Sequence, residues 1–115
     1  VGSKYFCGML ESRRSPSTDP LVVWLTGGLG CSSQLALLAE DGPCNVNKDG
    51  AGTVLNQYSW TAQANVVWVD QPAATGFSTG LPTTTGEDGV EKSMYIFLQN
   101  FYKALPQYAM HDFFI

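Results

Sequence analysis

The apolar run Leu21–Leu25 constrains the fold most, because it leads directly into the glycine-rich turn Thr26–Ser33. Every position of the run is apolar, which is typical of a strand covered on both faces. An apolar pattern with helical spacing follows from about residue 33 to residue 40. A turn from a strand into a helix directs backbone N–H groups toward one point, and glycines in it let a ligand approach the backbone closely. We therefore predict that this turn binds a phosphate, a carboxylate or an oxyanion.

The remaining apolar segments extend this pattern along the chain. Strands are predicted over residues 4–12, 65–70 and 111–115, and an amphipathic helix is predicted from the spacing of Val90, Met94, Phe97, Leu98, Phe101 and Leu105. The order strand, strand, helix, strand, helix, strand indicates the α/β class, with a mostly parallel central sheet and flanking helices. Ligands of such sheets bind at the carboxyl ends of the strands, so we expect residues 26–33 and 70–80 on one rim.

Local signals predict how some of these elements begin. Ser32 or Ser33 is placed to cap the first helix. Thr85 and Asp88 have the spacing of a capping box before the second helix. The stretch 45–57 is polar and contains an Asp-Gly pair, which is a turn signal.

Composition excludes several classes of function. The net charge is −4 and no basic stripe is present, so no nucleic-acid partner is expected. No apolar run approaches the length of a membrane span, so no membrane association is expected either. Cys7, Cys31 and Cys44 fit no zinc-binding spacing, and we predict neither a metal nor a cofactor. Cys7 lies in a strand pattern, where a buried free thiol is the ordinary interpretation.

Both ends of the chain lie inside strand patterns. The chain starts at Val1, just before the strand pattern of residues 4–12, and it stops at Ile115 in the apolar run 113–115. Because a natural domain rarely starts and stops in strands, we expect residues 1–115 to be a segment of one larger domain, truncated at both ends. No signal peptide is visible, which in a cut chain decides nothing about targeting.

The residues after the turn discriminate between its possible ligands. A phosphate loop requires a lysine after the last glycine, whereas Gly30 is followed by Cys31 and two serines. A dinucleotide loop requires a third glycine, which would fall at Ser33. The oxyanion loop of an α/β-hydrolase requires a strand, a glycine pair and a short helix, as found here. A tight turn without any ligand is the alternative.

The stretch Leu21–Ser33 resembles the signature of the serine carboxypeptidase family, which is usually W-L-N-G-G-P-G-C-S-S. Four further stretches resemble motifs of that family in the same order: Glu11–Arg13, Glu40–Pro43, Gln57–Trp60 and Asp70–Ser78. The resemblance implies a partial α/β-hydrolase fold. It also implies a serine-type carboxypeptidase, which removes C-terminal residues from peptides through an acyl-enzyme.

The resemblance implies a role for individual residues of the turn. Gly28 matches the glycine whose N–H helps to form the oxyanion hole. Gly27 matches the glycine whose N–H meets the terminal carboxylate of the substrate. Thr26 stands where the family has a carboxylate-binding asparagine, and Trp24 matches a tryptophan that supports this cluster. Glu40 matches a glutamate that pairs with a second acid; such a pair shares a proton, donates a hydrogen bond to the substrate carboxylate and favours activity at acidic pH.

The resemblance also implies which catalytic groups this chain does not contain. The family's nucleophile lies in a G-E-S-Y-A-G turn after the strand that corresponds to residues 111–115, and the aspartate and histidine of the triad come later. The 115 residues alone are therefore predicted to be inactive. Cys31 matches a cysteine that is disulfide-bonded to a distant cysteine absent from this chain. From the residues alone Cys31 could instead be a nucleophile, although no histidine lies near it in sequence.

Two residues are of a type found in catalytic triads but are not predicted to be catalytic. Ser78 satisfies a G-x-S-x-G pattern, but residues 71–75 separate it from the preceding strand and no helix follows, so a loop beside the pocket is the preferred interpretation. His111 is the only histidine of the sequence and is predicted to be a surface residue rather than the base of a triad.

Departures from the family pattern motivate two alternatives. Thr26 replaces an asparagine, Leu29 a proline, Ala74 a glycine and Thr79 an aromatic residue. A non-catalytic or degenerate fragment is the first alternative to a carboxypeptidase, and a small esterase using Ser78 is a weaker one.

The resemblance carries expectations about partners as well. It implies the C-terminus of a peptide or protein as the substrate, and a secretory, vacuolar, lysosomal or extracellular setting. We also expect the remainder of the parent domain to be needed for stable folding, because the free chain would expose strand edges and one face of the helix over 90–105.

Overall fold

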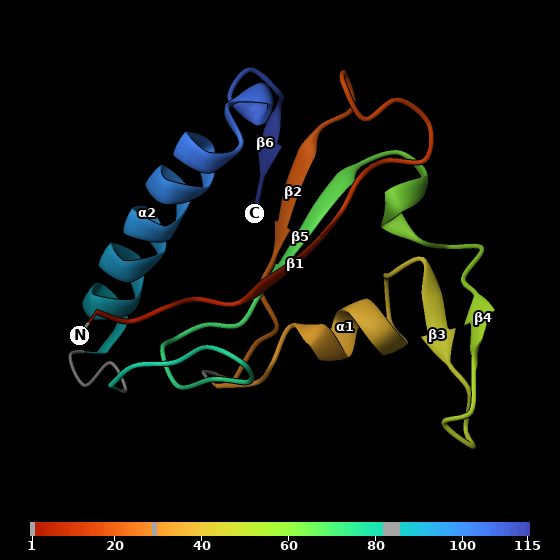
Figure 1. The fold of residues 1–115 in the computed structure, drawn as a ribbon, viewed down its shortest axis with the longest axis horizontal. Coiled ribbons are helices and arrows are strands. Elements are labelled where there is room, and N and C mark those ends of the chain that lie inside the picture. The colour runs from red at the N-terminus through yellow and green to blue at the C-terminus, as the bar shows by residue number, and fades with distance from the viewer. Residues whose placement is uncertain (1, 29, 82–85) are drawn as a thin grey trace.

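The computed structural model describes residues 2–28, 30–81 and 86–115 (Figure 1). Its central sheet has the order β1-β5-β2-β6 and is formed by β1 (Cys7–Leu10), β2 (Leu21–Trp24), β5 (Asn65–Val69) and β6 (Phe113–Phe114). Strand β5 pairs with β2 in parallel, and β2 pairs with β6 in parallel. The predicted mostly parallel α/β sheet is thereby confirmed. β1 is shorter than the predicted range 4–12, and it runs antiparallel to β5.

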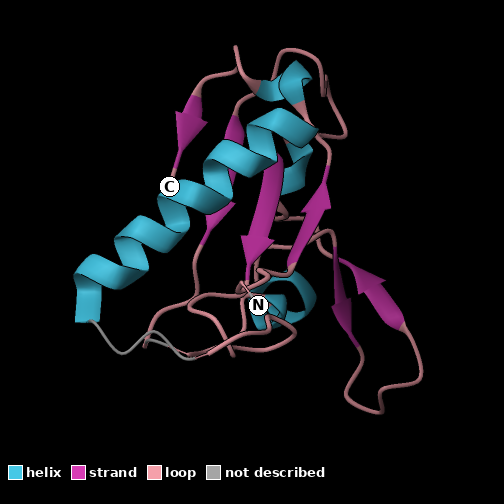
Figure 2. Cartoon of the chain, turned by 60° about the vertical axis from the view of Figure 1, so that its left-hand side comes forward, coloured by secondary structure: helices cyan, strands magenta, loops and turns pink. Residues whose placement is uncertain are grey.

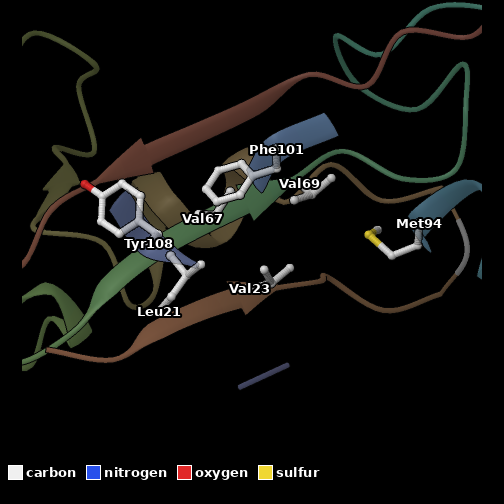
Figure 3. Packing of buried hydrophobic residues seen from close by; sticks show 7 residues of the cluster. All are labelled: Leu21, Val23, Val67, Val69, Met94, Phe101 and Tyr108. Carbon is white, nitrogen blue, oxygen red and sulfur yellow. The ribbon is translucent and has the colours of Figure 1, made fainter. Parts of the chain in front are cut away.

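The two principal helices cover opposite faces of this sheet (Figures 1 and 2). Helix α2 (Gly86–Ala104) lies over one face and α1 (Gln34–Ala39) over the other. The cluster beneath α2, seen in Figure 3, contains Leu21, Val23, Val67, Val69, Met94, Phe101 and Tyr108. The cluster on the α1 side contains Ala36, Ala64, Val66 and Trp68. Side chains of a strand alternate between faces, so the apolarity of β2, and of β5 after Asn65, reflects burial on both faces of the sheet.

Helix α2 follows the spacing predicted for it. Its buried residues are Met94 and Phe101, and Phe97, Leu98 and Leu105 pack partly buried against the same cluster. Acidic side chains in its first turn and Lys103 in its last turn suit the helix dipole. The predicted capping box at Thr85 lies outside the described residues. A short 3₁₀ helix, η2 (Pro106–Tyr108), follows α2 because proline cannot continue it.

The polar stretch after α1 contains structure that the sequence reasoning did not assign. Strands β3 (Cys44–Val46) and β4 (Thr53–Leu55) form an antiparallel hairpin around the Asp-Gly turn signal, and a 3₁₀ helix, η1 (Trp60–Ala62), follows. No residue of β4 is buried and each strand has only three residues, which is too short for the alternation of apolar and polar residues by which a half-covered strand is recognised. Within the described part of the chain, no helix is long and apolar enough to cross a membrane.

Candidate functional site

The glycine-rich turn and the loop after β5 lie together at the carboxyl ends of β2 and β5, toward the lower edge of the sheet in Figure 1. The Ser32 hydroxyl donates to Asp70 Oδ1 at 2.7 Å, and the Ser33 backbone N–H donates to the same oxygen at 2.8 Å. These bonds join residues almost forty positions apart in sequence. They confirm the prediction that residues 26–33 and 70–80 share one rim.

Asp70 is the centre of this rim. Its side chain is fully buried, and Oδ1 also accepts a longer contact of 3.4 Å from Gln34 Nε2. The other oxygen, Oδ2, accepts from the Phe77 backbone N–H at 3.0 Å. No cation pairs with this carboxylate among the described residues, so its charge is compensated by hydrogen bonds from neutral donors.

The backbone of Asp70 makes two further connections. Its N–H donates to Phe6 O at 3.0 Å, and its carbonyl accepts the Ser78 hydroxyl at 2.6 Å. Ser78 Oγ in turn accepts the Phe6 N–H at 2.8 Å. The segment leading into β1, the end of β5 and the following loop are thus held together around one residue.

Gly76 leaves the space that the Asp70 carboxylate occupies. A Cβ built on Gly76 would lie 2.2 Å from Asp70 Oδ2 and 2.9 Å from Ser32 Oγ, which is far inside van der Waals contact. Its φ of 54° also lies in the left-handed region that side chains disfavour. Only glycine therefore lets the loop after β5 close over Asp70.

Within the glycine-rich turn, Gly27 and Gly28 are exposed, and Gly28 adopts a φ of 84°. Among the described residues neither of their N–H groups has a hydrogen-bond partner. The preceding Thr26 N–H is held by Ser33 Oγ at 3.0 Å, which closes the turn across its base. Adjacent free N–H groups at a strand–helix turn can bind a carboxylate oxygen or an oxyanion. Leu29 lies outside the described residues.

Trp24 supports the threonine of the turn. Its indole Nε1 donates to Thr26 Oγ1 at 3.2 Å, and its ring packs edge-on against Trp60 with centroids 5.0 Å apart. The Thr26 hydroxyl consequently has one acceptor position filled and keeps its own hydrogen for another partner. Trp24 and Thr26, both predicted site residues, are brought into contact.

Glu40 stands apart from this contact. It follows α1, whose six residues span about 9 Å, and it is exposed. Its backbone carbonyl accepts Asn56 Nδ2 at 2.9 Å, but within the described residues its carboxylate has no hydrogen bond to Trp24, Thr26 or Gly27. No second acid pairs with it in the described part of the chain.

Its neighbour Asp41 is buried instead. Asp41 Oδ1 accepts Trp68 Nε1 at 3.0 Å, whereas Oδ2 is buried without a partner in the described residues. Burial raises the pKa of Asp41, and the bond from Trp68 opposes that rise.

The remaining candidates have other surroundings. Ser78 is buried, and both hydrogen bonds of its hydroxyl go to backbone groups, so it carries no feature of an exposed nucleophile. His111 is half-buried, with Nδ1 2.7 Å from Asp19 O. All three cysteines are free, and Cys31 is exposed. Burial and the charge of Asp70 raise the pKa of Cys7, which suits an unreactive thiol.

The sequence placed Ser33, Asp70 and Gly76 in stretches expected on the rim but indicated no individual role for them in the site. Their signal is present: a buried apolar strand ends in an acidic residue, and a glycine follows six positions later. A carboxylate at the carboxyl end of a buried strand requires donors, and the nearest N–H groups are those of the neighbouring turn.

The fold and this rim define a segment of the α/β-hydrolase fold class, with a glycine-rich turn at the carboxyl end of a parallel strand. The family model described as serine carboxypeptidase matches residues 1–115, the entire chain. The chain belongs to the serine carboxypeptidase family.

Individual relatives agree with this assignment. Serine carboxypeptidase-like 47 of Arabidopsis thaliana is 43% identical over 116 residues, covering 98% of this chain and 23% of that protein. Carboxypeptidase Y of Schizosaccharomyces pombe is 42% identical, and the match covers 96% of this chain and 11% of that protein. The crystal structure of Kex1(delta)p, a prohormone-processing carboxypeptidase from Saccharomyces cerevisiae, superposes with a TM-score of 0.84 at 32% identity, covering 98% of this chain and 26% of that one. The chain thus spans about a quarter, or less, of these relatives' lengths.

Proposed function

We propose that residues 24–28 supply the oxyanion and carboxylate-binding loop of a serine-type carboxypeptidase whose other catalytic groups lie elsewhere in a longer domain. The observation that supports this is the pair of exposed, unpartnered N–H groups of Gly27 and Gly28 on the rim beside Trp24 and Thr26. Membership of the family supports a peptide or protein C-terminus as the substrate.

In this proposal each group of the loop has one task. A serine oxygen outside these residues attacks the last peptide carbonyl, and the Gly28 N–H stabilises the negative charge that forms on the carbonyl oxygen. The proton of that serine passes through a base outside these residues to the leaving nitrogen, the C–N bond breaks and the C-terminal amino acid leaves. Water then hydrolyses the acyl-enzyme, which releases the shortened peptide and restores the serine hydroxyl. The Gly27 N–H and the Thr26 hydroxyl bind the free carboxylate of the substrate. Glu40 takes part through a second acid contributed by the rest of the domain.

The test uses the complete protein and an N-blocked dipeptide. Release of the C-terminal amino acid, together with fluorophosphonate labelling of a serine other than Ser78, is the expected result. A Ser78→Ala variant is the matched control and should keep the label, since the Ser78 hydroxyl bonds only to backbone. Loss of the label in that variant would support a small esterase instead.

A non-catalytic family member remains the competing proposal, and Thr26 is the residue that favours it. Asparagine offers an amide with two hydrogens, whereas the threonine hydroxyl offers one and already accepts from Trp24. A complete protein that neither releases amino acids nor reacts with fluorophosphonate would support this second function.

We further propose that residues 1–115 need the rest of the domain for stable folding. Edge strand β6 is exposed, and large apolar side chains of α1 and α2, among them Leu35, Leu38, Tyr95 and Ile96, are about half exposed or more. Such surfaces favour aggregation of the free chain. A cooperative urea transition of the isolated 115 residues, at a concentration where the chain stays monomeric, would contradict this proposal.

The cellular setting is a proposal too. Cys31 is exposed and free, as expected of a cysteine whose disulfide partner is supplied by another part of the protein. A structural disulfide would indicate a secretory, vacuolar, lysosomal or extracellular environment. Mass spectrometry of the complete protein without reduction would identify the partner of Cys31, or show a free thiol and remove this support.

A further inference from the structure

We infer that Asp70 is a positioning residue that holds the Gly27 and Gly28 N–H groups in their working geometry through Ser33. The inference rests on the proposed function, because it concerns the oxyanion loop of that reaction. Asp70 does not touch the substrate in this account; it acts on the loop through a chain of hydrogen bonds.

The first step is the fixing of the turn's carboxyl end. Asp70 Oδ1 accepts the Ser33 N–H at 2.8 Å and the Ser32 hydroxyl at 2.7 Å, while Asp70 itself is fixed by the Phe77 N–H and by its own place at the end of β5. The carboxylate is fully buried, so water does not compete for these bonds. The start of α1 is thereby fixed relative to the sheet.

The second step is transmission to the other end of the turn. Ser33 is 1% exposed, and its hydroxyl accepts the Thr26 N–H at 3.0 Å. Ser33 therefore binds Asp70 with its backbone and Thr26 with its side chain. The residues between these two anchors include Gly27 and Gly28, whose positions follow from where the anchors stand. Glycine backbones have wide conformational freedom, so the hydrogen bonds at Thr26 and Ser33 must restrict the positions of the two glycine N–H groups.

The third step concerns the kind of acceptor required. An ionised carboxylate offers two oxygens that only accept, and the donors around Asp70 point at both of them. An asparagine of the same shape would keep one oxygen and turn an NH₂ donor toward either Ser33 or Phe77. With the NH₂ toward Ser33, the Ser33 N–H would face another donor and the glycine turn would have to shift; with the NH₂ toward Phe77, the loop that closes over Asp70 would shift and free the carboxamide to move relative to Ser33. Oxyanion donors must lie about 2.7–3.1 Å from the developing charge, so a small displacement is costly.

The experiment compares Asp70→Asn with Asp41→Asn in the complete protein. Both aspartates are buried, but no hydrogen bond of Asp41 leads to the glycine turn in the described residues. Removing one oxyanion donor lowers kcat about 100-fold or more, so Asp70→Asn should lower kcat by about 100-fold. The melting temperature of the variant is measured alongside to show that it is folded. The control should keep kcat within about threefold, since it leaves the turn untouched.

A second readout does not depend on catalysis. Glycine-selective ¹⁵N labelling reports the amide shifts of Gly27 and Gly28, with Gly50 in the exposed hairpin loop as an internal reference. In Asp70→Asn the first two signals should move or broaden while Gly50 stays fixed, and Asp41→Asn should move none of the three. Unchanged Gly27 and Gly28 signals in a folded Asp70→Asn protein, or an unchanged kcat, would overturn the inference.

The two readouts, kcat and the glycine amide signals, test the proposed carboxypeptidase function and the positioning role of Asp70 separately. If the wild-type protein releases no C-terminal residue, the proposed carboxypeptidase function fails and the amide signals alone decide the role of Asp70. If Asp70→Asn does not fold, Ser33→Ala replaces it, because that change removes the acceptor of Thr26 N–H and leaves the Ser33 N–H on Asp70. Ser33→Ala should move the same two glycine signals and lower kcat about tenfold; a folded Ser33→Ala protein with neither effect would refute the inference.

Discussion

Asp70 and Asp41 are both buried, and the difference between them lies in what surrounds their oxygens. Asp70, beside the first turn of α1, has donors on both oxygens from residues 32–34 and 77. Asp41, after the last turn of α1, has Trp68 Nε1 on one oxygen and, among the described residues, no partner on the other. Burial of a carboxyl group is tolerated in proportion to its hydrogen-bond donors, so the Asp70 side chain is held in place on both oxygens, whereas the burial of Asp41 is compensated on one oxygen only.

The origin of the donors differs as well. Those of Asp70 come from segments before and after it that are far apart in sequence, and they close the rim on which the candidate site lies. The Asp41 carboxylate is joined to a single neighbouring strand through Trp68. Loss of the Asp70 network should therefore disturb several loops at once, whereas loss of the Asp41 bond should stay local.

Gly76→Ala should have the largest effect on stability. The new methyl group would overlap the Asp70 carboxylate, and φ at this position is unfavourable for alanine, so we expect a loss of about 3 kcal/mol or more in the free energy of unfolding. Urea unfolding of the complete protein measures it.

The matched control for that change is Gly50→Ala. Gly50 also has a positive φ, of 69°, but nothing lies within 4 Å of the position that a Cβ would take there, so only about 1 kcal/mol should be lost. Equal losses at the two glycines would show that backbone conformation alone, and not contact with Asp70, explains the requirement for glycine at position 76.

Asp70→Ala should rank second and should exceed Asp41→Ala. The first change leaves several buried donors without an acceptor and should cost about 2–4 kcal/mol, whereas the second orphans Trp68 Nε1 alone and should cost about 1–2 kcal/mol. Chemical denaturation of the two variants side by side provides the measurement. A larger loss for Asp41→Ala would reverse our ranking of the two networks.

Thr26→Asn tests the functional side of the Asp70 rim. Asparagine adds a second donor for a terminal carboxylate, and one hydrogen bond to a charged group is worth about 1.5–3 kcal/mol. We expect KM for peptides with a free C-terminus to fall about tenfold or more, with amide-blocked peptides unaffected. The same fall for blocked peptides would mean that Thr26 does not face the carboxylate.

The continuous apolarity of residues 21–25 and 66–69 was sufficient to predict two strands of a mostly parallel sheet and the rim at their carboxyl ends. The spacing of Met94, Phe97 and Phe101 likewise predicted the buried face of α2. These patterns are local and repeat with the period of one element, which is why one sequence reveals them.

The individual contacts between these two loops were not predictable in this way. Asp70 was named only within the stretch 70–80 of the rim and within the motif Asp70–Ser78, because its own role depends on which N–H groups the fold brings to it. The hairpin β3–β4 was not predicted because its strands are short and largely exposed. Glu40 was placed by resemblance, and the structure leaves it exposed at the far end of α1, so its pairing with a second acid remains a prediction.

Asp41→Asn should have the smallest effect, and its sign should depend on pH. Burial raises the pKa of Asp41 above 3.8 in the folded protein, so the folded state binds more protons than the unfolded state between those two pKa values. Stability contributed by the protonated form is therefore lost as pH rises through that window. An asparagine keeps the acceptor for Trp68 and never ionises, so the variant should gain stability relative to the wild type as pH rises from 3.8 through the raised pKa of Asp41.

Asp19 supplies the opposite sign within the same protein. Its hydrogen bonds with Arg14 and Ser12 lower its pKa to about 2, so its contribution is present above 3.8 and is lost as pH falls toward 2. Thermal unfolding of the two variants across the acidic range measures both effects. The stability difference between Asp41→Asn and the wild type should change as pH rises above 3.8, and that between Asp19→Asn and the wild type should change as pH falls from 3.8 toward 2. If Asp41→Asn gains nothing as pH rises, the unpartnered oxygen of Asp41 must have a donor in the complete protein, and the contrast between the two buried aspartates would disappear.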